Sequence, residues 1–380
     1  MTTINTTLPD WWIETTLGEV CDIVMWQSPK WESYNLIWDW LPFYQWVTEF
    51  WKKFVTIKTY TNQPTRIVNP NTLLFSVRAP VWRVNFTEHQ ACIGRWNAWL
   101  IMKNWNQDFL YYLLNFIEKQ IINRSSWTVF DSISWKELKE IPLAISKNNL
   151  EQQAIAKILS PFDDKIELLR EQNVTLEKIA QTIFEEWFGK YSFDDELPEG
   201  WRVGKLGEVI KFIKWKKPSD TSETFIDWYI PQILIETFDS WKITYANPKN
   251  TVLTNENDLI MVMDWASSWR LEIWYNWIVW STLSKIEIEE DLRLLVFALL
   301  KSKFKEINDG TTGSSIPHTD KAKIYDFDYF ITDKDYLKNF NQLYWNFLSK
   351  ILDNKKQIQT LSKTRDELLP KLMKGEVKVV

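Results

Sequence analysis

The 380-residue chain has few of the residues that carry redox, metal-binding or acid–base chemistry, with two cysteines and two histidines. Cys21 and Cys92 lack the close spacing of metal ligands, so we expect two small buried side chains in a reducing compartment. His89 and His318 have no candidate nucleophile near them in the sequence, and we expect surface or packing roles for both. The sequence therefore predicts no metal site and no histidine-based active site.

Long apolar runs and nucleotide-binding motifs are also missing. No run of 18 apolar residues occurs, and the start of the sequence, MTTINTTLPD, resembles no signal peptide, so we expect a cytoplasmic location. We find no phosphate-binding G-x-x-x-x-G-K-[ST], no G-x-G-x-x-G at a strand–helix junction and no zinc-binding H-E-x-x-H. Asn69-Pro70 and Asn247-Pro248 do not continue into the Pro-aromatic pair of amino-methyltransferases. We therefore expect no catalytic residue and no cofactor in this chain.

Glycine is scarce and tryptophan abundant, with 9 Gly and 25 Trp, whereas glycine averages about 7% of residues. Many Trp stand beside Asp, Asn or Pro in turns, where glycine is usual because it tolerates positive φ. These are Trp38, Trp40, Trp82, Trp96, Trp99, Trp265 and Trp277. We hypothesise that the source organism reads as glycine a codon that is translated here as Trp. A naturally Trp-rich protein is the alternative.

The two halves of the chain repeat each other at an offset of 185 to 189 residues. Leu8–Trp12 with Leu17–Val20 matches Leu197–Trp201 with Leu206–Val209, and Asn71–Phe75 aligns with Asn257–Met261. The alignment sets Trp11 against Gly200, Trp280 against Gly94 and Trp127 against Gly313, which supports the glycine hypothesis. We expect native glycine, and strained or exposed turns, at Trp11, Trp26, Trp82, Trp127, Trp265 and Trp280. Trp12, Trp187 and Trp201 are expected to be true tryptophans, and Trp135 and Trp345 stay undecided.

Each half ends in a heptad pattern of apolar residues, which predicts a coiled coil. One seam runs from Ile155 to Trp187 and the other from Phe340 to Leu372. A two-fold-like arrangement makes the helices antiparallel and pairs residues whose numbers sum to 527. Asn173 then faces Asn354 in one polar layer; the alternative is that both amides face water. Pro161 predicts a bend or a late helix start.

The remaining segments predict an α+β fold: two similar globular domains separated by two long helices that form an antiparallel coiled coil. The expected boundaries are 1–147, 148–191, 192–333 and 334–380. Strands are expected at Phe54–Ile57, Thr72–Val77, Leu259–Met263 and Ile278–Ile286, and helices at Asp108–Asn123 and Leu292–Lys305.

The net charge of −5 excludes a uniformly basic surface, yet turn-rich segments carry basic side chains that can reach a DNA groove. The candidates are Lys30, Arg78, Arg83, Arg95, Lys214, Lys216, Lys217 and Arg270. Polar residues of such turns complete the set: Gln27, Ser28, Asn97, Ser267, Ser268, Thr312 and Ser314. For each residue, an ordinary solvated surface position is the alternative.

With Trp read as Gly, several segments resemble conserved turns of type I restriction-modification specificity subunits. Met25–Pro29 resembles M-G-Q-S-P, and Asp264–Leu271 resembles D-G-A-x-x-G-R-[VL], as does Arg78–Val84 with Arg78 in place of the Asp. Glu151–Ala156, Phe184-x-x-Trp187-Phe188 and Arg365–Gly375 resemble the family's central and C-terminal conserved regions. The resemblance spans nearly the whole chain, and Pro161 departs from it.

The resemblance implies a division of labour. Each globular domain would be a target-recognition domain that reads one half of a bipartite double-stranded DNA target. The helices would dock methyltransferase subunits, and restriction-translocase subunits would join through them, so that S-adenosylmethionine and ATP belong to partners. A helix of roughly 33 residues rises about 48 Å, enough to separate two readers by one DNA turn of about 34 Å. Alternatives are a specificity component of a fused or type II-like system, a coiled-coil adaptor that binds no DNA, and a carbohydrate-binding protein with Trp platforms.

Overall fold

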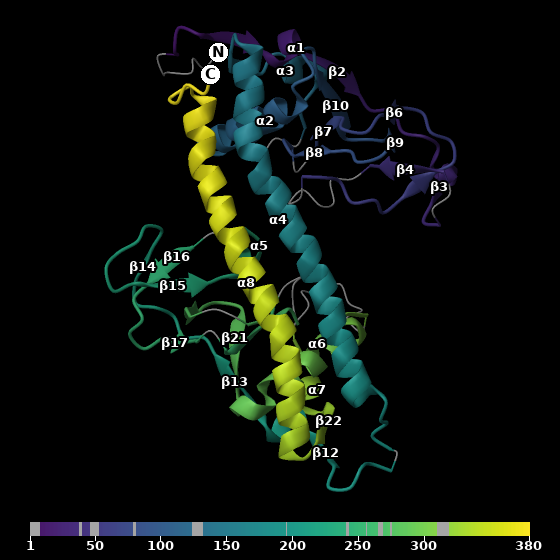
Figure 1. The fold of residues 1–380 in the computed structure, drawn as a ribbon, viewed down its shortest axis with the longest axis vertical. Coiled ribbons are helices and arrows are strands. Elements are labelled where there is room, and N and C mark those ends of the chain that lie inside the picture. Colours follow the sequence, from purple (N-terminus) through teal and green to yellow (C-terminus); the bar gives the residue numbers. More distant parts are fainter. Residues whose placement is uncertain are drawn as a thin grey trace. The chain divides into compact units, whose positions relative to one another are not determined.

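The structure is a computed structural model that describes residues 8–37, 40–45, 53–78, 81–123, 132–194, 196–240, 243–255, 257–264, 269–273, 276–309 and 319–380. The chain divides into two compact units, drawn in Figure 1. Unit 1 comprises residues 1–169 and 360–380, and unit 2 comprises residues 170–359. Each unit therefore contains one globular part together with one end of both long helices.

The described residues of unit 1 form three sheets. β1 (Trp12–Thr16) pairs antiparallel with β11 (Pro142–Ser146). A four-stranded sheet has the order β2-β10-β7-β8, with bounds Cys21–Met25, Asn97–Met102, Leu73–Ser76 and Val84–Phe86. A five-stranded sheet has the order β3-β5-β4-β9-β6, with bounds Tyr34–Asn35, Tyr60–Thr61, Leu41–Tyr44, Ala91–Ile93 and Ile67–Val68. The helices of this globular part are α1 (Leu17–Val20), α2 (Gln107–Asn123) and α3 (Trp135–Lys139).

Unit 2 repeats these three sheets in the same order. β12 (Arg202–Lys205) pairs with β22 (Asp328–Ile331). The four-stranded order is β13-β21-β18-β19, with bounds Ile210–Lys214, Leu283–Ile288, Leu259–Val262 and Leu271–Ile273. The five-stranded order is β14-β16-β15-β20-β17, with bounds Thr221–Ser222, Thr244–Ala246, Ile230–Ile233, Ile278–Val279 and Val252–Leu253. The helices are α5 (Ile235–Ser240), α6 (Arg293–Asp309) and α7 (Lys321–Tyr325). The sequence repeat is thus a repeat of the fold.

Local chemistry explains why corresponding helices start where they do. Ser134 and Glu137 form a reciprocal capping box before α3, since Glu137 N donates to Ser134 Oγ at 3.3 Å and Ser134 N donates to Glu137 Oε2 at 2.8 Å. In unit 2, Asp320 occupies the corresponding N-cap, and Ala322 N donates to its carboxylate at 2.9 Å. Short capped helices therefore lie at equivalent places in the two units.

The long helices are α4 (Asn149–Phe184) and α8 (Lys334–Met373), with 36 and 40 residues. A π-helical turn over Glu185–Gly189 extends α4. In unit 2 they run antiparallel, because Trp187 packs against Phe340 at 5.9 Å between ring centroids while Asn173 bonds Asn354. In unit 1, Ile155 and Leu372 share one buried core. The expected α+β fold with an antiparallel helix pair is confirmed.

Three local expectations differ from the structure. α4 begins at Asn149 and continues through Pro161, so the late helix start does not occur. Asn148 caps the first turn of α4, because its Oδ1 accepts a hydrogen bond from Leu150 N at 2.9 Å. Phe54–Ile57 forms no strand and makes only an isolated bridge from Phe54 to Phe86. The run expected at Ile278–Ile286 is two strands, β20 and β21, separated by a turn with Ser281 at φ +59°.

Tryptophan dominates the non-glycine residues with positive φ. Among the described residues, nine non-glycine residues have positive φ, and six of them are Trp: Trp40, Trp82, Trp96, Trp105, Trp228 and Trp269. Such a bulky residue is strained in this region, which supports the glycine hypothesis. Trp26 is 39% exposed, but Trp11 and Trp280 are half-buried without positive φ, against our expectation for them. Trp127 and Trp265 lie outside the described residues.

Candidate nucleic-acid interface

In unit 1, four candidate residues gather where the edge strand β2 ends. Gln27, Ser28 and Lys30 follow that strand directly, and Arg95 follows β9. The two segments are joined because Arg95 N donates to Ser28 Oγ at 2.8 Å. The side chains of Gln27, Lys30 and Arg95 are exposed. The fold thus presents amide, ammonium and guanidinium groups from one surface region.

Unit 2 presents a lysine-rich segment at the equivalent place. Lys214 ends the edge strand β13, and Lys216 and Lys217 follow it; all three are exposed. Between them, the Trp215 ring packs edge-on against Trp280 at 4.8 Å between centroids. Polar or basic side chains therefore follow the corresponding edge strand in both units, and side chains of these types can bond phosphates and base edges.

Two further residues of this region were missed from the sequence. Thr65 Oγ1 donates to Gln27 O, and Arg66 accepts from Ile93 N at 2.9 Å through its backbone oxygen. Both are exposed. The loop before β6 therefore lies beside the segment after β2. Only the pairing of strands far apart in sequence shows this, because no motif marks Thr65 or Arg66.

The side chains of three candidates are engaged in hydrogen bonds or ion pairs within the protein. Asn97 is buried, and its Nδ2 donates to Tyr44 O at 3.1 Å. Arg83 forms an ion pair with Glu118 of α2 at 3.1 Å, and Arg270 forms one with Glu272 at 2.9 Å. Arg83 and Arg270 each follow a positive-φ Trp, Trp82 or Trp269, so they are equivalent in the repeat. We leave these three residues out of the proposed interface.

Of the remaining DNA-binding candidates, only one lies within the described residues. Arg78 is exposed, and its backbone forms an isolated bridge with Ser132. Ser267, Ser268, Thr312 and Ser314 lie outside the described residues.

The described part of the chain contains no group of three or more His, Cys, Asp or Glu that could hold a metal. Among the same described residues, no helix is long and apolar enough to cross a membrane.

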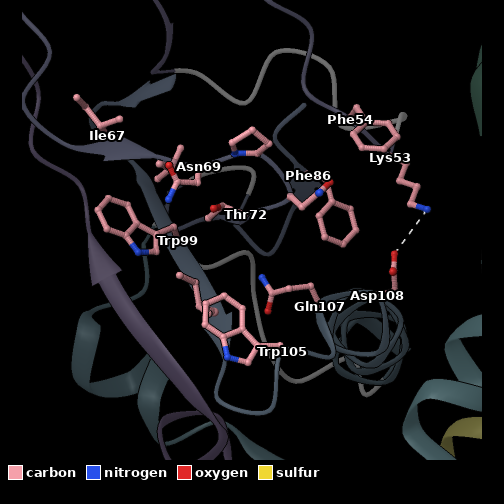
Figure 2. A pocket seen from close by; sticks show the side chains of 14 residues that line it. Lys53, Phe54, Ile67, Asn69, Thr72, Phe86, Trp99, Trp105, Gln107 and Asp108 are labelled. Atoms are coloured by element: carbon pink, nitrogen blue, oxygen red, sulfur yellow. Dashed lines mark ion pairs between the residues drawn. The ribbon is translucent and has the colours of Figure 1, made fainter. Parts of the chain in front are cut away.

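A pocket of about 650 Å³ opens in the globular part of unit 1, as Figure 2 shows. Trp99, Trp105 and Phe86 line it with Asn69, Thr72 and Gln107, and the Lys53–Asp108 ion pair of 3.7 Å closes one side. In unit 2 the positions of Thr72 and Trp99 are held by Asp258 and Lys285, which form an ion pair at 2.5 Å. The pocket is therefore not a repeated feature, and we assign it no role.

Hydrogen bonds and ion pairs of charged side chains connect the globular part of each unit to α4 or α8. In unit 1, the Tyr112 hydroxyl of α2 donates to Asp163 of α4 at 2.6 Å, and Arg365 of α8 donates to the same carboxylate. In unit 2, Lys355 of α8 forms an ion pair with Glu272 of β19 at 2.9 Å. Burial alone would raise the pKa of Glu272, but the positive charges of Lys355, Lys301 and Arg270 outweigh it and lower that pKa to about 2.

Comparison with known proteins shows which family the chain is similar to. Residues 9–178 match the family described as "Type I restriction modification DNA specificity domain". The chain is 27% identical over 367 residues to the type I restriction enzyme MjaIX specificity subunit of Methanocaldococcus jannaschii, covering 86% of this chain and 82% of that one. It is 35% identical over 180 residues to the putative MjaX specificity subunit of the same organism, 46% and 42% of the two chains.

A solved structure shares the fold. The crystal structure of the type I restriction-modification system S subunit from M. genitalium superposes with a TM-score of 0.59 at 17% identity, and 98% of each chain is covered. Residues 9–178 therefore match the type I DNA specificity domain, and most of the chain is similar to a type I specificity subunit.

Proposed function

We propose that this chain reads a bipartite double-stranded DNA target and docks methyltransferase subunits in a type I restriction-modification complex. Each globular part serves as one target-recognition domain, and restriction-translocase subunits join through the methyltransferase. The chain itself catalyses no reaction, and it acts in the cytoplasm. The domain boundaries expected from the sequence, 1–147, 148–191, 192–333 and 334–380, belong to this proposal.

One observation carries the proposal: the same fold occurs twice, and in both copies polar or basic side chains follow the corresponding edge strand. Gln27, Ser28 and Lys30 do so in unit 1, and Lys216 and Lys217 do so in unit 2. Two related readers in one chain suit a target with two separated halves. The overall negative charge does not oppose this, because the methyltransferase partner can supply further phosphate contacts.

The salt dependence of DNA binding tests the proposal. The chain is purified with a methyltransferase subunit from the same organism, and binding to duplex DNA carrying the genomic target is measured by fluorescence anisotropy from 50 to 200 mM salt. We expect Lys216→Ala/Lys217→Ala to weaken binding and to make the slope of log K against log salt shallower by roughly 0.9 for each phosphate that is no longer neutralised. Lys211→Ala, an exposed lysine within β13, is the matched control. Equal slopes for wild type and the double variant would contradict this interface.

A specificity component of a fused or type II-like system is the second candidate. The fold does not distinguish this system from a type I assembly, so the co-purifying partner must. A separate ATP-dependent restriction subunit that co-purifies with the chain supports the type I assembly. An adaptor that binds no DNA fails the same binding experiment altogether.

A further inference from the structure

Two loops at corresponding places expose apolar side chains. In unit 1, the loop between β3 and β4 carries Leu36 and Ile37, which are 75% and 79% exposed. In unit 2, the loop between β14 and β15 carries Phe225 and Ile226, which are 67% and 37% exposed. The two loops have the same place in the topology. In each five-stranded sheet, the loop connects two strands that lie on either side of a third, β5 in unit 1 and β16 in unit 2. We call these two residue pairs the apolar loop pairs.

The two pairs are equivalent in the repeat. Pro42 of β4 corresponds to Pro231 of β15, and each pair lies at the same distance in sequence before its proline. A single exposed apolar residue needs no explanation, because every protein surface has some. The same exposed pair at the same position of both halves does need one, since the rest of the two loops differs in sequence.

Local contacts involve the described residues of both apolar loop pairs. Ile37 N donates to Asn35 Oδ1 at 3.3 Å in unit 1. In unit 2, Tyr229 N donates to Ile226 O at 3.1 Å, and the Phe225 ring meets Tyr245 of β16 edge-on at 5.6 Å between centroids. These contacts restrict the chain at Ile37 and at Phe225–Ile226, which lowers the conformational entropy lost there when a partner covers the apolar side chains.

The surroundings favour a nucleic-acid partner over a protein. Exposed lysines precede both loops, Lys30 in unit 1 and Lys216 with Lys217 in unit 2. The loops themselves contain no Lys or Arg and carry Asp39 in unit 1 and Glu223 with Asp227 in unit 2, so they do not suit contact with phosphates. DNA offers apolar atoms in two forms: the C5-methyl group of thymine in the major groove, and the face of a base whose stacking is opened.

We propose that Leu36–Ile37 and Phe225–Ile226 enter the bound DNA and contact apolar base atoms, one pair in each half of the target. This inference rests on the proposed DNA-reading function. The lysines after the edge strands hold the phosphates, and the apolar loop pairs add contacts that depend on the bases.

The test uses the full chain in complex with its methyltransferase and a duplex carrying the target. The variants are Leu36→Ser/Ile37→Ser and Phe225→Ser/Ile226→Ser, and Leu253→Ser, at a 45% exposed position of β17, is the control. Each double variant is expected to lose about 10-fold or more in target affinity, the loss that goes with about 1.4 kcal/mol. The slope of log K against log salt should equal that of wild type. Unchanged thermal melting shows that the exposed substitutions leave the fold intact.

Two arms identify the apolar atoms. Uracil in place of thymine in one half of the target removes the methyl groups, and a weaker wild-type complex then assigns the contact to a thymine methyl. A rise in 2-aminopurine fluorescence that wild type produces and the variants do not assigns it to an opened base step.

The possible failures are separate. If the wild-type complex does not bind the target, the proposed function itself fails. If wild type binds and both double variants bind equally well, the inference is overturned while the function stands. If the variants no longer co-purify with the methyltransferase, the loops dock a protein and the inference is overturned as well.

Discussion

The Nδ2 atom of Asn354 donates a 2.9 Å hydrogen bond to Oδ1 of Asn173 across the helix pair of unit 2. Both side chains are buried, 0% and 8% exposed, so the alternative that they face water is wrong. The pairing follows the predicted register, in which residue numbers sum to 527. Trp187 and Phe340 obey the same rule. One polar layer within an apolar seam penalises slipped registers, which would bury an unpartnered amide.

This layer predicts a double-mutant cycle. Asn354→Leu leaves the Asn173 amide buried without its partner and should lower the free energy of unfolding by about 1–3 kcal/mol. Asn173→Leu/Asn354→Leu should recover most of that loss, because two apolar side chains then meet. Urea unfolding measures both. A double variant less stable than either single variant contradicts a paired layer.

The Glu272 cluster predicts a large loss from a small change. Glu272→Gln keeps the shape but leaves Lys355 and Arg270 without the carboxylate that each contacts at 2.9 Å. Breaking such a buried arrangement should cost about 3–5 kcal/mol in the free energy of unfolding. The exposed Glu287 of β21 provides the control, since Glu287→Gln should change stability by less than about 0.5 kcal/mol. Similar effects of the two variants would refute the cluster's role.

The same carboxylate predicts a pH dependence. The pKa of Glu272 is lowered from 4.5 to about 2, so its stabilisation is complete above pH 4.5 and is lost as pH falls toward 2. The difference in free energy of unfolding between wild type and Glu272→Gln should therefore shrink as the pH falls, by an amount on the order of 2 kcal/mol between pH 5 and pH 3. Urea unfolding at pH 5, 4 and 3 measures it; a difference that stays constant argues against the lowered pKa.

In unit 1, Tyr112→Phe should loosen the packing of α2 on α4. The variant removes a hydroxyl that donates to Asp163 at 2.6 Å, and Asp163 is 4% exposed. Hydrogen bonds to charged groups contribute about 1.5–3 kcal/mol. We expect a decrease of that size in the free energy of unfolding, measured in urea. A decrease below about 0.5 kcal/mol would show that Arg365 alone satisfies the carboxylate.

The positive-φ tryptophans predict stabilising substitutions. Trp105 and Trp228 have φ of +63° and are 76% and 75% exposed, so glycine there relieves strain and sacrifices little packing. We expect Trp105→Gly and Trp228→Gly each to raise the free energy of unfolding by about 0.5–1 kcal/mol. Trp31 is equally exposed, at 76%, but begins a 3-10 helix, so Trp31→Gly should destabilise. The same sign at all three positions would contradict the strain argument, and peptide mass spectrometry of the native protein shows directly which residue it carries.

The repeat and the helix register could be predicted from the sequence because both depend on periodicity. The heptad seam fixes which residues meet, and α2 and α6 start within one residue of their expected positions at Asp108 and Leu292. The late helix start expected at Pro161 does not occur, because packing of Ile155, Leu159 and Ile166 on both sides of it outweighs one missing hydrogen bond.

The candidate interface was harder to predict. Arg83 and Arg270 stand in turn-rich sequence like true DNA-binding residues, yet each is held by a carboxylate, Glu118 or Glu272, and Glu118 lies in a helix far along the chain. Asn97 is buried by strand pairing that no local pattern reveals. Conversely, Thr65 and Arg66 reach the segment after β2 only through the folded sheet.

Methylation-sensitive sequencing of the source genome tests the central claim most directly. If the chain reads DNA with two related domains, the genome should contain one bipartite motif, two short specific halves separated by unspecified bases, with methylated adenine in each half. Deletion of this gene should remove methylation at that motif alone. Adenine methylation at the motif that persists without the gene, or the absence of any bipartite motif while gene and methyltransferase are expressed, would contradict the account.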